Sequence, residues 1–140
     1  MKIGEIKIQA LVLIFPSADL EYEEESINEA VFALKQSPSY GSYISASVGS
    51  INRALAVIES RLGIAPLDKI THLTPNDTVL DLQESIAQII PYFIKGDLLL
   101  SESPSEAEQA FKLFEELLDK AFVKTSEPKS TVYSLKELLK

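Results

Sequence analysis

The segment 43–62, YISASVGSINRALAVIESRL, constrains the fold more than any other part of the chain. Its apolar residues recur at alternating steps of four and three, a spacing that places them along one side of a helix. Apolar surface avoids water, so other segments must cover this seam. The seam consists of Ile44, Val48, Ile51, Leu55, Ile58 and Leu62, and we expect Ser45, Ser47, Asn52, Glu59 and Ser60 to face away from it.

Length and composition fit one domain with one core. The chain has 140 residues, of which 46% are hydrophobic, enough for a core and too many for a disordered chain. The net charge of −8 should repel phosphate backbones, so we expect no nucleic-acid binding, sequence-specific or otherwise. The absence of cysteine excludes disulfides, thiolate metal sites and a thiol nucleophile.

Nothing in the sequence predicts membrane insertion. The longest apolar runs, 10–15 and 89–94, are far too short to span a bilayer. The apolar stretch at the N-terminus contains Glu5 and Lys7 and lacks a small-residue cleavage site, so it does not fit a signal peptide. We therefore expect no membrane partner and an intracellular or virion location.

Several helices are expected around the central one. Residues 3–15 fit either a strand or a helix, and we favour a helix because Leu11 and Leu13 break the alternation. The acidic run 21–25 suits the N-terminus of the next helix. Its expected apolar face is formed by Ile27, Ala30, Val31 and Leu34.

Glycine and proline mark the expected ends of the central helix. Ser37 can cap it with Pro38 in the first helical position, so the helix can begin as early as Pro38. Gly63 fits a C-cap, and Gly49 marks either a close backbone approach or a bend. The segment 69–82 alternates and then turns at a Pro-Asn-Asp sequence, which indicates a short β-hairpin or an extended loop.

The last long helices should form an antiparallel hairpin. Segment 83–100 is apolar nearly all round, and Pro91 must either kink its helix or mark a restart. Ser103 and Glu106 fit a capping box with Pro104 at the first helical position. Aromatic residues should meet across this hairpin, with the central seam packed against it: Tyr92, Phe93, Phe111 and Phe114.

The sequence thus predicts a mainly α protein, a small helical bundle. Residues 1–122 form the expected single domain, and 123–140 form an extended C-terminal tail. Apolar residues of this tail either form a short helix that docks on a neighbouring subunit or belong to a frayed chain end.

We expect no catalytic, cofactor-binding or metal-binding residue. A structural role is favoured for the one histidine, His72, because a catalytic base usually comes with an orienting group. Asp77, Asp81 and Glu84 could share a face and hold a cation, but solvated carboxylates are the more common case. The sparse acid–base chemistry argues against an enzyme.

Two groups of residues are candidates for protein contacts. Arg53 either pairs with Glu59 or the acidic run, or contacts a partner, since arginine is enriched at interfaces. Tyr40 and Tyr43 could anchor either the core or an interface.

Several stretches resemble the head–tail connector, or head-completion adaptor, proteins of tailed bacteriophages. They are MKIGEIKIQAL at 1–11, GSINRAL at 49–55, IPYFIKGDLLL at 90–100 and SPSEAEQAFKLFEELL at 103–118. Segment 66–82 departs from the family, whose members carry a longer β-containing segment there.

The resemblance implies a non-enzymatic virion protein that is in the host cytoplasm during assembly. It implies a homo-oligomeric ring on the portal protein that joins head to tail and presents a platform to the next connector or tail protein. A ring needs two different patches that meet. We expect one patch at Tyr40, Tyr43, Asn52 and Arg53, and the other at Val132, Tyr133, Leu135 and Leu138. The alternative is a helical adaptor or regulatory protein of a cellular complex.

Overall fold

The structure, a computed structural model, describes residues 1–126, with side chains described as far as Ala121. Within this range the protein is mainly helical and contains no strand, as the sequence predicts. The elements are α1 (Ile3–Ile14), the 3-10 helix η1 (Glu24–Ser26), α2 (Ile27–Lys35), α3 (Gly41–Leu62), α4 (Glu84–Ala87), α5 (Ile90–Leu99) and α6 (Pro104–Ser126).

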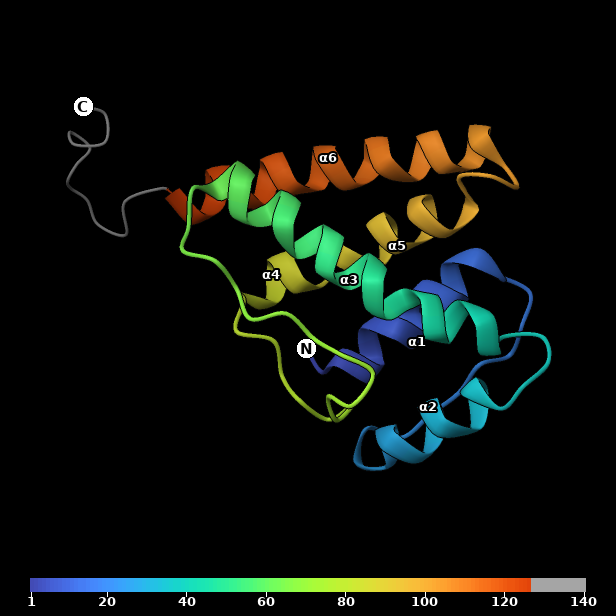
Figure 1. The fold of residues 1–140 in the computed structure, drawn as a ribbon. Helices are drawn as coiled ribbons and strands as arrows, with labels where there is room; N and C mark the ends of the chain where they lie inside the picture. Colours follow the sequence, from blue (N-terminus) through green and yellow to red (C-terminus); the bar gives the residue numbers. More distant parts are fainter. Residues whose placement is uncertain (127–140) are drawn as a thin grey trace.

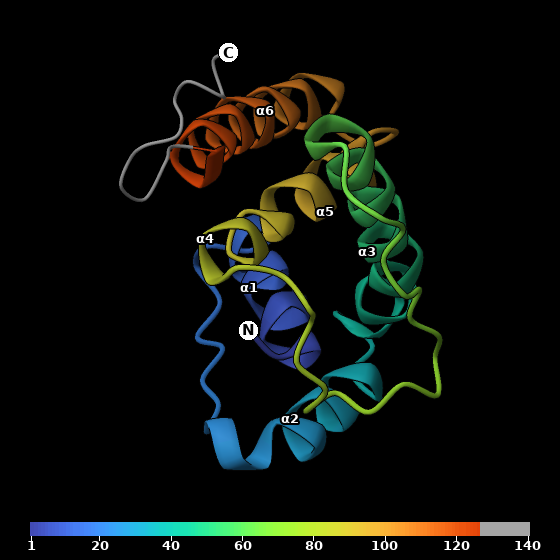
Figure 2. The same ribbon diagram turned by 90° about the vertical axis from the view of Figure 1, so that its left-hand side faces the viewer.

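The helices follow one another across the bundle in the order α6, α5, α1 and α2, and α3 runs along one side of this stack (Figures 1 and 2). Helix α5 occupies the centre, in contact with α6, α3 and α1. A central helix has little surface left for water, which explains why segment 83–100 is apolar nearly all round. None of the helices in the described part of the chain is long and apolar enough to cross a membrane.

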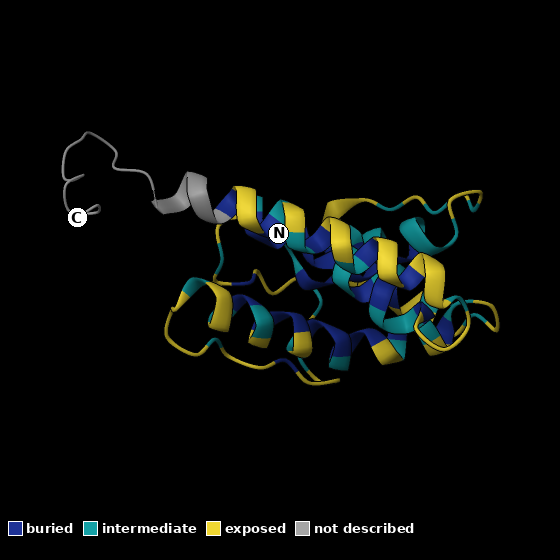
Figure 3. Cartoon of the chain, turned by 90° about the horizontal axis from the view of Figure 1, so that it is seen from above, coloured by how far each residue is buried: buried dark blue, intermediate teal, exposed yellow. Residues whose placement is uncertain are grey.

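Two apolar clusters hold the bundle together. The larger joins α1, α3, α5 and α6 and includes Ile6, Ile51 and Phe114. The smaller joins α1, α2 and the first turn of α3 and includes Ile8 and Ile27. Figure 3 shows that α3 and α6 bury the sides that face the bundle and expose the opposite sides.

The apolar seam of α3 is confirmed, but the buried face is wider than the sequence predicts. Ser47, expected to face away from the seam, is buried, and Ser50 is buried beside it. The expectation is wrong because α1, α2 and α5 all contact α3, which leaves less of it exposed. Both hydroxyls find acceptors: Ser47 Oγ donates to the Ile44 carbonyl at 2.6 Å, and Ser50 Oγ to Asp97 Oδ2 at 2.5 Å.

The helix ends agree with the sequence signals at some positions and not at others. Gly63 adopts φ 65° and ψ 33°, the left-handed conformation of a C-cap, as predicted. Helix α3 begins at Gly41 and not at Pro38, because Ser37 Oγ accepts a bond from the Ser39 amide in a preceding turn. Pro91 marks a restart, since α4 ends before it and α5 begins one residue ahead of it.

The predicted helical hairpin is present as α5 and α6. The ring of Phe93 packs edge-on against Phe111 and Phe114, with centroids 5.3 and 5.2 Å apart. Helix α3 packs on α5, which places the central seam against this hairpin, as expected.

Segment 63–83 is an extended loop, so the hairpin alternative for 69–82 is not formed. Its closest approach to strand pairing is an isolated antiparallel bridge between Val79 and Lys2. The first amides of a helix lack partners within the helix, and the loop supplies them for α1. The Ile3 amide donates to the Thr78 carbonyl and the Gly4 amide to the Asn76 carbonyl, both at 2.9 Å.

Candidate docking site

Tyr40 and Tyr43 are half-buried at the start of α3. Both rings pack edge-on against Phe15, with centroids 5.2 and 5.1 Å apart. The Tyr43 hydroxyl donates to Glu102 Oε1 at 3.4 Å. Desolvation, and then the charge of Glu102, raises the pKa of Tyr43. Both rings therefore pack within the fold, where they join the start of α3 to the end of α1.

Asn52 holds the long loop against α3. Its amide donates to the Ile70 carbonyl and accepts from the Ile70 amide, both at 2.9 Å. A second side chain of α3 holds the same loop, since Glu59 Oε2 accepts from the Leu67 amide at 2.6 Å. The Asn52 side chain can form both hydrogen bonds with Ile70 because an asparagine amide carries a donor and an acceptor. The sequence analysis predicts Asn52 at an interface. No sequence pattern links Asn52 to Ile70, so the hydrogen bonds between them could not be predicted.

Arg53 forms an ion pair, one of the two alternatives that the sequence leaves open, but its partner is Asp97 of α5 and not Glu59 or the acidic run. Its Nη2 and Nε lie 2.5 and 3.0 Å from Asp97 Oδ2. The Arg53 side chain is still 59% exposed, against 17% for Asp97. The other arginine, Arg61, bridges α3 to Glu115 and Asp119 of α6, and the hydrogen bond to Glu115 is the main cause of its raised pKa.

The predicted interface residues of α3 thus turn toward different elements. Tyr40 and Tyr43 meet the end of α1, Asn52 the loop, and Arg53 helix α5. The second predicted patch, Val132, Tyr133, Leu135 and Leu138, lies outside the described residues, as does the expected tail beyond Ser126.

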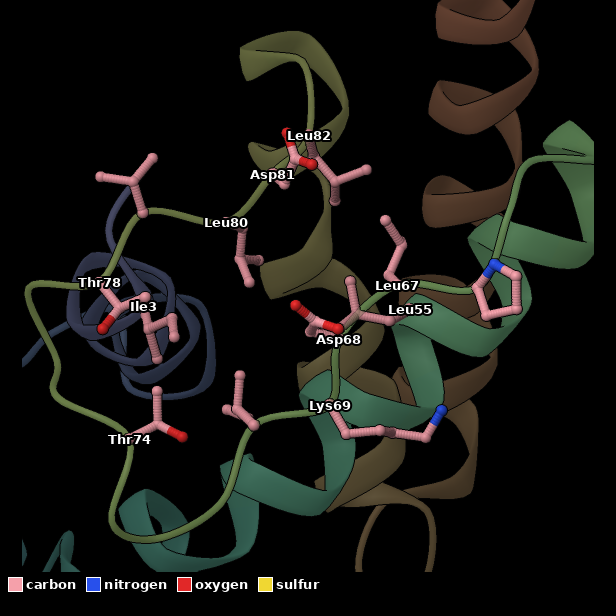
Figure 4. Close-up of a pocket in the computed structure, with 13 residues that line it drawn as sticks. Ile3, Leu55, Leu67, Asp68, Lys69, Thr74, Thr78, Leu80, Asp81 and Leu82 are labelled. Carbon is pink, nitrogen blue, oxygen red and sulfur yellow. The ribbon is translucent and has the colours of Figure 1, made fainter.

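A cavity of about 250 Å³ lies between the loop and the helices α1 and α3. Figure 4 shows its apolar wall, which includes Ile3, Leu55 and Leu80, and the polar chains of Asp68 and Lys69 along the loop. The lining combines alkyl side chains with the hydroxyls of Thr74 and Thr78, the carboxylates of Asp68 and Asp81 and the ammonium of Lys69.

The acidic residues near this loop do not gather around one point. Asp81 lines the cavity, whereas Glu84 Oε1 accepts from the Met1 ammonium at 2.8 Å. That hydrogen bond is the main cause of the lowered pKa of Glu84. In the part of the chain that the structure describes, no group of three or more His, Asp or Glu residues could hold a metal ion.

The loop and α2 expose large apolar side chains. We call this region, as a candidate for protein contacts, the docking surface. Leu73 is 91% exposed, Phe32 64% and Val79 60%. Phe32 and His72, the neighbour of Leu73, line the same cavity. Figure 2 shows the loop reaching α2, where the Asn76 amide donates to Asn28 Oδ1 at 2.9 Å. This surface could not be predicted from the sequence, because the packing of the loop decides which apolar residues stay exposed.

Comparisons of the chain with protein families, curated proteins and solved structures find no match.

Proposed function

We propose that the protein is a non-enzymatic assembly subunit that acts by docking on other proteins. The role that we favour is the head–tail connector of a tailed bacteriophage, in which copies form a ring on the portal protein. The sequence resemblance at 1–11, 49–55, 90–100 and 103–118 suggests the family. The docking surface is the single observation on which the assembly role rests.

That surface combines apolar exposure with a fixed backbone. Loop carbonyls at Thr78 and Asn76 accept bonds from α1, and Asn52 binds both backbone groups of Ile70. Side chains of α2 and α3 hold the loop at Asn76 and Leu67. A fixed loop that presents Leu73 to solvent loses little conformational entropy on binding, which favours association. Large exposed apolar areas commonly mark protein interaction sites, and Leu73, Phe32 and Val79 supply such area on the loop and on α2.

The direct test is co-purification with the portal protein encoded in the same genome, followed by electron microscopy of the complex. We expect a ring of copies on the portal. The Leu73→Ser variant should fold normally and weaken the complex at least tenfold, a typical loss for a buried interface anchor. Leu113→Ser, which changes an exposed leucine of α6, is the matched control and should bind as the unaltered protein does.

Two further measurements bear on the ring. Truncation after Lys129 should leave the monomer folded but abolish assembly, because the second interface patch is proposed to lie at 132–139. Duplex DNA should bind weakly even at low salt, since the chain carries a net charge of −8. Assembly of the truncated protein, or tight DNA binding, would contradict these parts of the proposal. Neighbouring genes for portal, capsid and tail proteins would favour the connector over a cellular adaptor.

A further inference from the structure

A second cavity, of about 260 Å³, opens between α1, α2, α3 and the tip of the long loop. Its polar lining differs in charge from the rest of this acidic protein. The residues are basic or neutral, and no carboxylate lines the cavity among those that the structure describes. The polar groups are Lys7, Asn28, Lys35, Ser45, His72 and Asn76.

Lys7 is the deepest of these groups. The residue is only 6% exposed, and its Nζ donates to Asn76 Oδ1 at 2.8 Å. The backbone of Asn76 is itself fixed. Its backbone carbonyl accepts from the Gly4 amide, and its backbone N–H donates to Asn28 Oδ1. The fold therefore holds an ammonium group at the wall of the cavity in a defined position.

The basic groups of this cavity have no counter-ion within residues 1–121. The ion pairs there involve other cations: the Met1 amine, Lys2, Arg53 and Arg61. A buried charge without an opposite charge is costly. Burial, and then the nearby charge of Lys35, lowers the pKa of Lys7 to about 8. A carboxylate that entered the cavity would reduce both costs, since it would pair with Lys7 and screen it from Lys35.

Exposed apolar side chains near the cavity mouth indicate which kind of molecule carries that carboxylate. Phe32 lines the cavity and is 64% exposed. Leu73, which follows the cavity residue His72 in the chain, is 91% exposed. A small free anion would make no contact with these apolar side chains. A peptide can place an acidic residue in the cavity and pack an apolar neighbour against the exposed side chains.

We infer that this cavity binds the carboxylate of an acidic segment in a partner protein, with an apolar residue of the same segment packed on Phe32 and Leu73. The inference rests on the proposed docking function and names the chemistry of the partner.

The probe is a capped synthetic peptide with adjacent Glu and Leu residues, titrated into the full-length protein by calorimetry. Lys35→Met should weaken binding about tenfold, as expected for loss of a charge-assisted contact. Lys7→Met should weaken it at least as much. Lys112→Met, which removes an exposed lysine of α6, should leave the affinity unchanged. In NMR titrations, the bound peptide should raise the pKa of Lys7 from about 8 toward its ordinary value of 10.5.

Several results would overturn the inference. The same peptide with Gln in place of Glu could bind as tightly, sodium acetate could bind as tightly as the peptide, or the Lys112 variant could lose as much affinity as the Lys35 variant. Self-association that Lys35→Glu abolishes, without peptide binding, would assign the cavity to a second copy of the chain and also overturn it. Portal binding without peptide binding refutes only this inference, whereas peptide binding without portal binding refutes only the connector role.

Discussion

The side-chain amide of Asn52 forms two hydrogen bonds of 2.9 Å with the backbone of Ile70, one to its carbonyl and one from its amide. The pair reproduces, between a helix and a loop, the exchange of bonds seen between two strands. Ile70 is 5% exposed, so water cannot easily replace either bond. This contact fixes the middle of the loop that carries the docking surface.

Replacing Asn52 by Ala should therefore destabilise the protein by about 1–3 kcal/mol, the usual cost of leaving buried backbone groups unpaired. Urea denaturation measures the loss, and hydrogen exchange should show faster exchange of the Ile70 amide. Ser60→Ala, at an exposed position of the same helix, is the control and should change stability by less than about 0.5 kcal/mol. Equal stability of the two variants would mean that the Asn52 contact contributes nothing.

The helices could be predicted from sequence because their signals are local. The spacing of Ile44, Ile51 and Ile58 defined the buried side of α3, and Gly63 and Pro104 marked helix ends that the structure confirms. The aromatic contacts of Phe93 also followed from this pattern, because two adjacent apolar helices joined by a short turn pack antiparallel.

The contacts of the loop and of the charged residues could not be predicted in this way. Arg53 pairs with Asp97, which is 44 residues away in the chain, and many other carboxylates were equally available. Lys7 lies in an apolar stretch whose sequence pattern does not predict its contact with Asn76. Such pairs depend on how the helices cross, which hydrophobic spacing does not specify.

Gly96 allows α5 and α6 to approach each other closely. A Cβ atom at this position would lie 2.9 Å from ring atoms of Phe111, which already packs against Phe93. Gly96→Ala should therefore cost about 1–2 kcal/mol in unfolding free energy, because the strain of overpacking exceeds the gain in helix propensity.

Gly49→Ala on α3 is the matched control. A Cβ there would lie 3.3 Å from Arg53 Nη1. The Arg53 side chain is 59% exposed, so its guanidinium can shift slightly while it still pairs with Asp97. This variant should be more stable than the unaltered protein by up to about 1 kcal/mol, the propensity difference between Gly and Ala. Thermal unfolding of both variants measures these changes. A shift of stability in the same direction for both substitutions would contradict a specific close approach at Gly96.

Removing Asp97 should cost more unfolding free energy than removing its ion-pair partner Arg53. Arg53→Ala removes a mostly exposed partner and should cost about 0.5–1 kcal/mol. Asp97→Ala also removes the acceptor of the buried Ser50 hydroxyl, so its cost should reach about 1–3 kcal/mol. Urea denaturation compares the two, with Asp97→Asn as the control because its amide oxygen can still accept from Ser50. Equal costs for both alanine variants would contradict this assignment.

Lys7 should make stability depend on alkaline pH. Its pKa is about 8 in the folded protein and 10.5 ordinarily, so between these values the unfolded chain binds more protons and stability rises with pH. Each unit of pKa difference corresponds to about 1.4 kcal/mol. Because the ammonium partly faces the open cavity, we expect a total gain of only about 1–2 kcal/mol.

Lys7→Met should abolish this rise and should be more stable than the unaltered protein below pH 8, where it no longer buries a charge. The charged or titratable groups that share the cavity with Lys7 are Lys35 of α2 and His72 of the loop, whereas α3 contributes the neutral Ser45. Urea denaturation from about pH 7 to pH 10 measures the effect as a difference between proteins, which cancels the titration of other groups. Lys112→Met is the control and should keep the rise, because Lys112 is exposed on α6. Parallel pH profiles for the unaltered protein and Lys7→Met would show that the Lys7 ammonium is hydrated in the folded state.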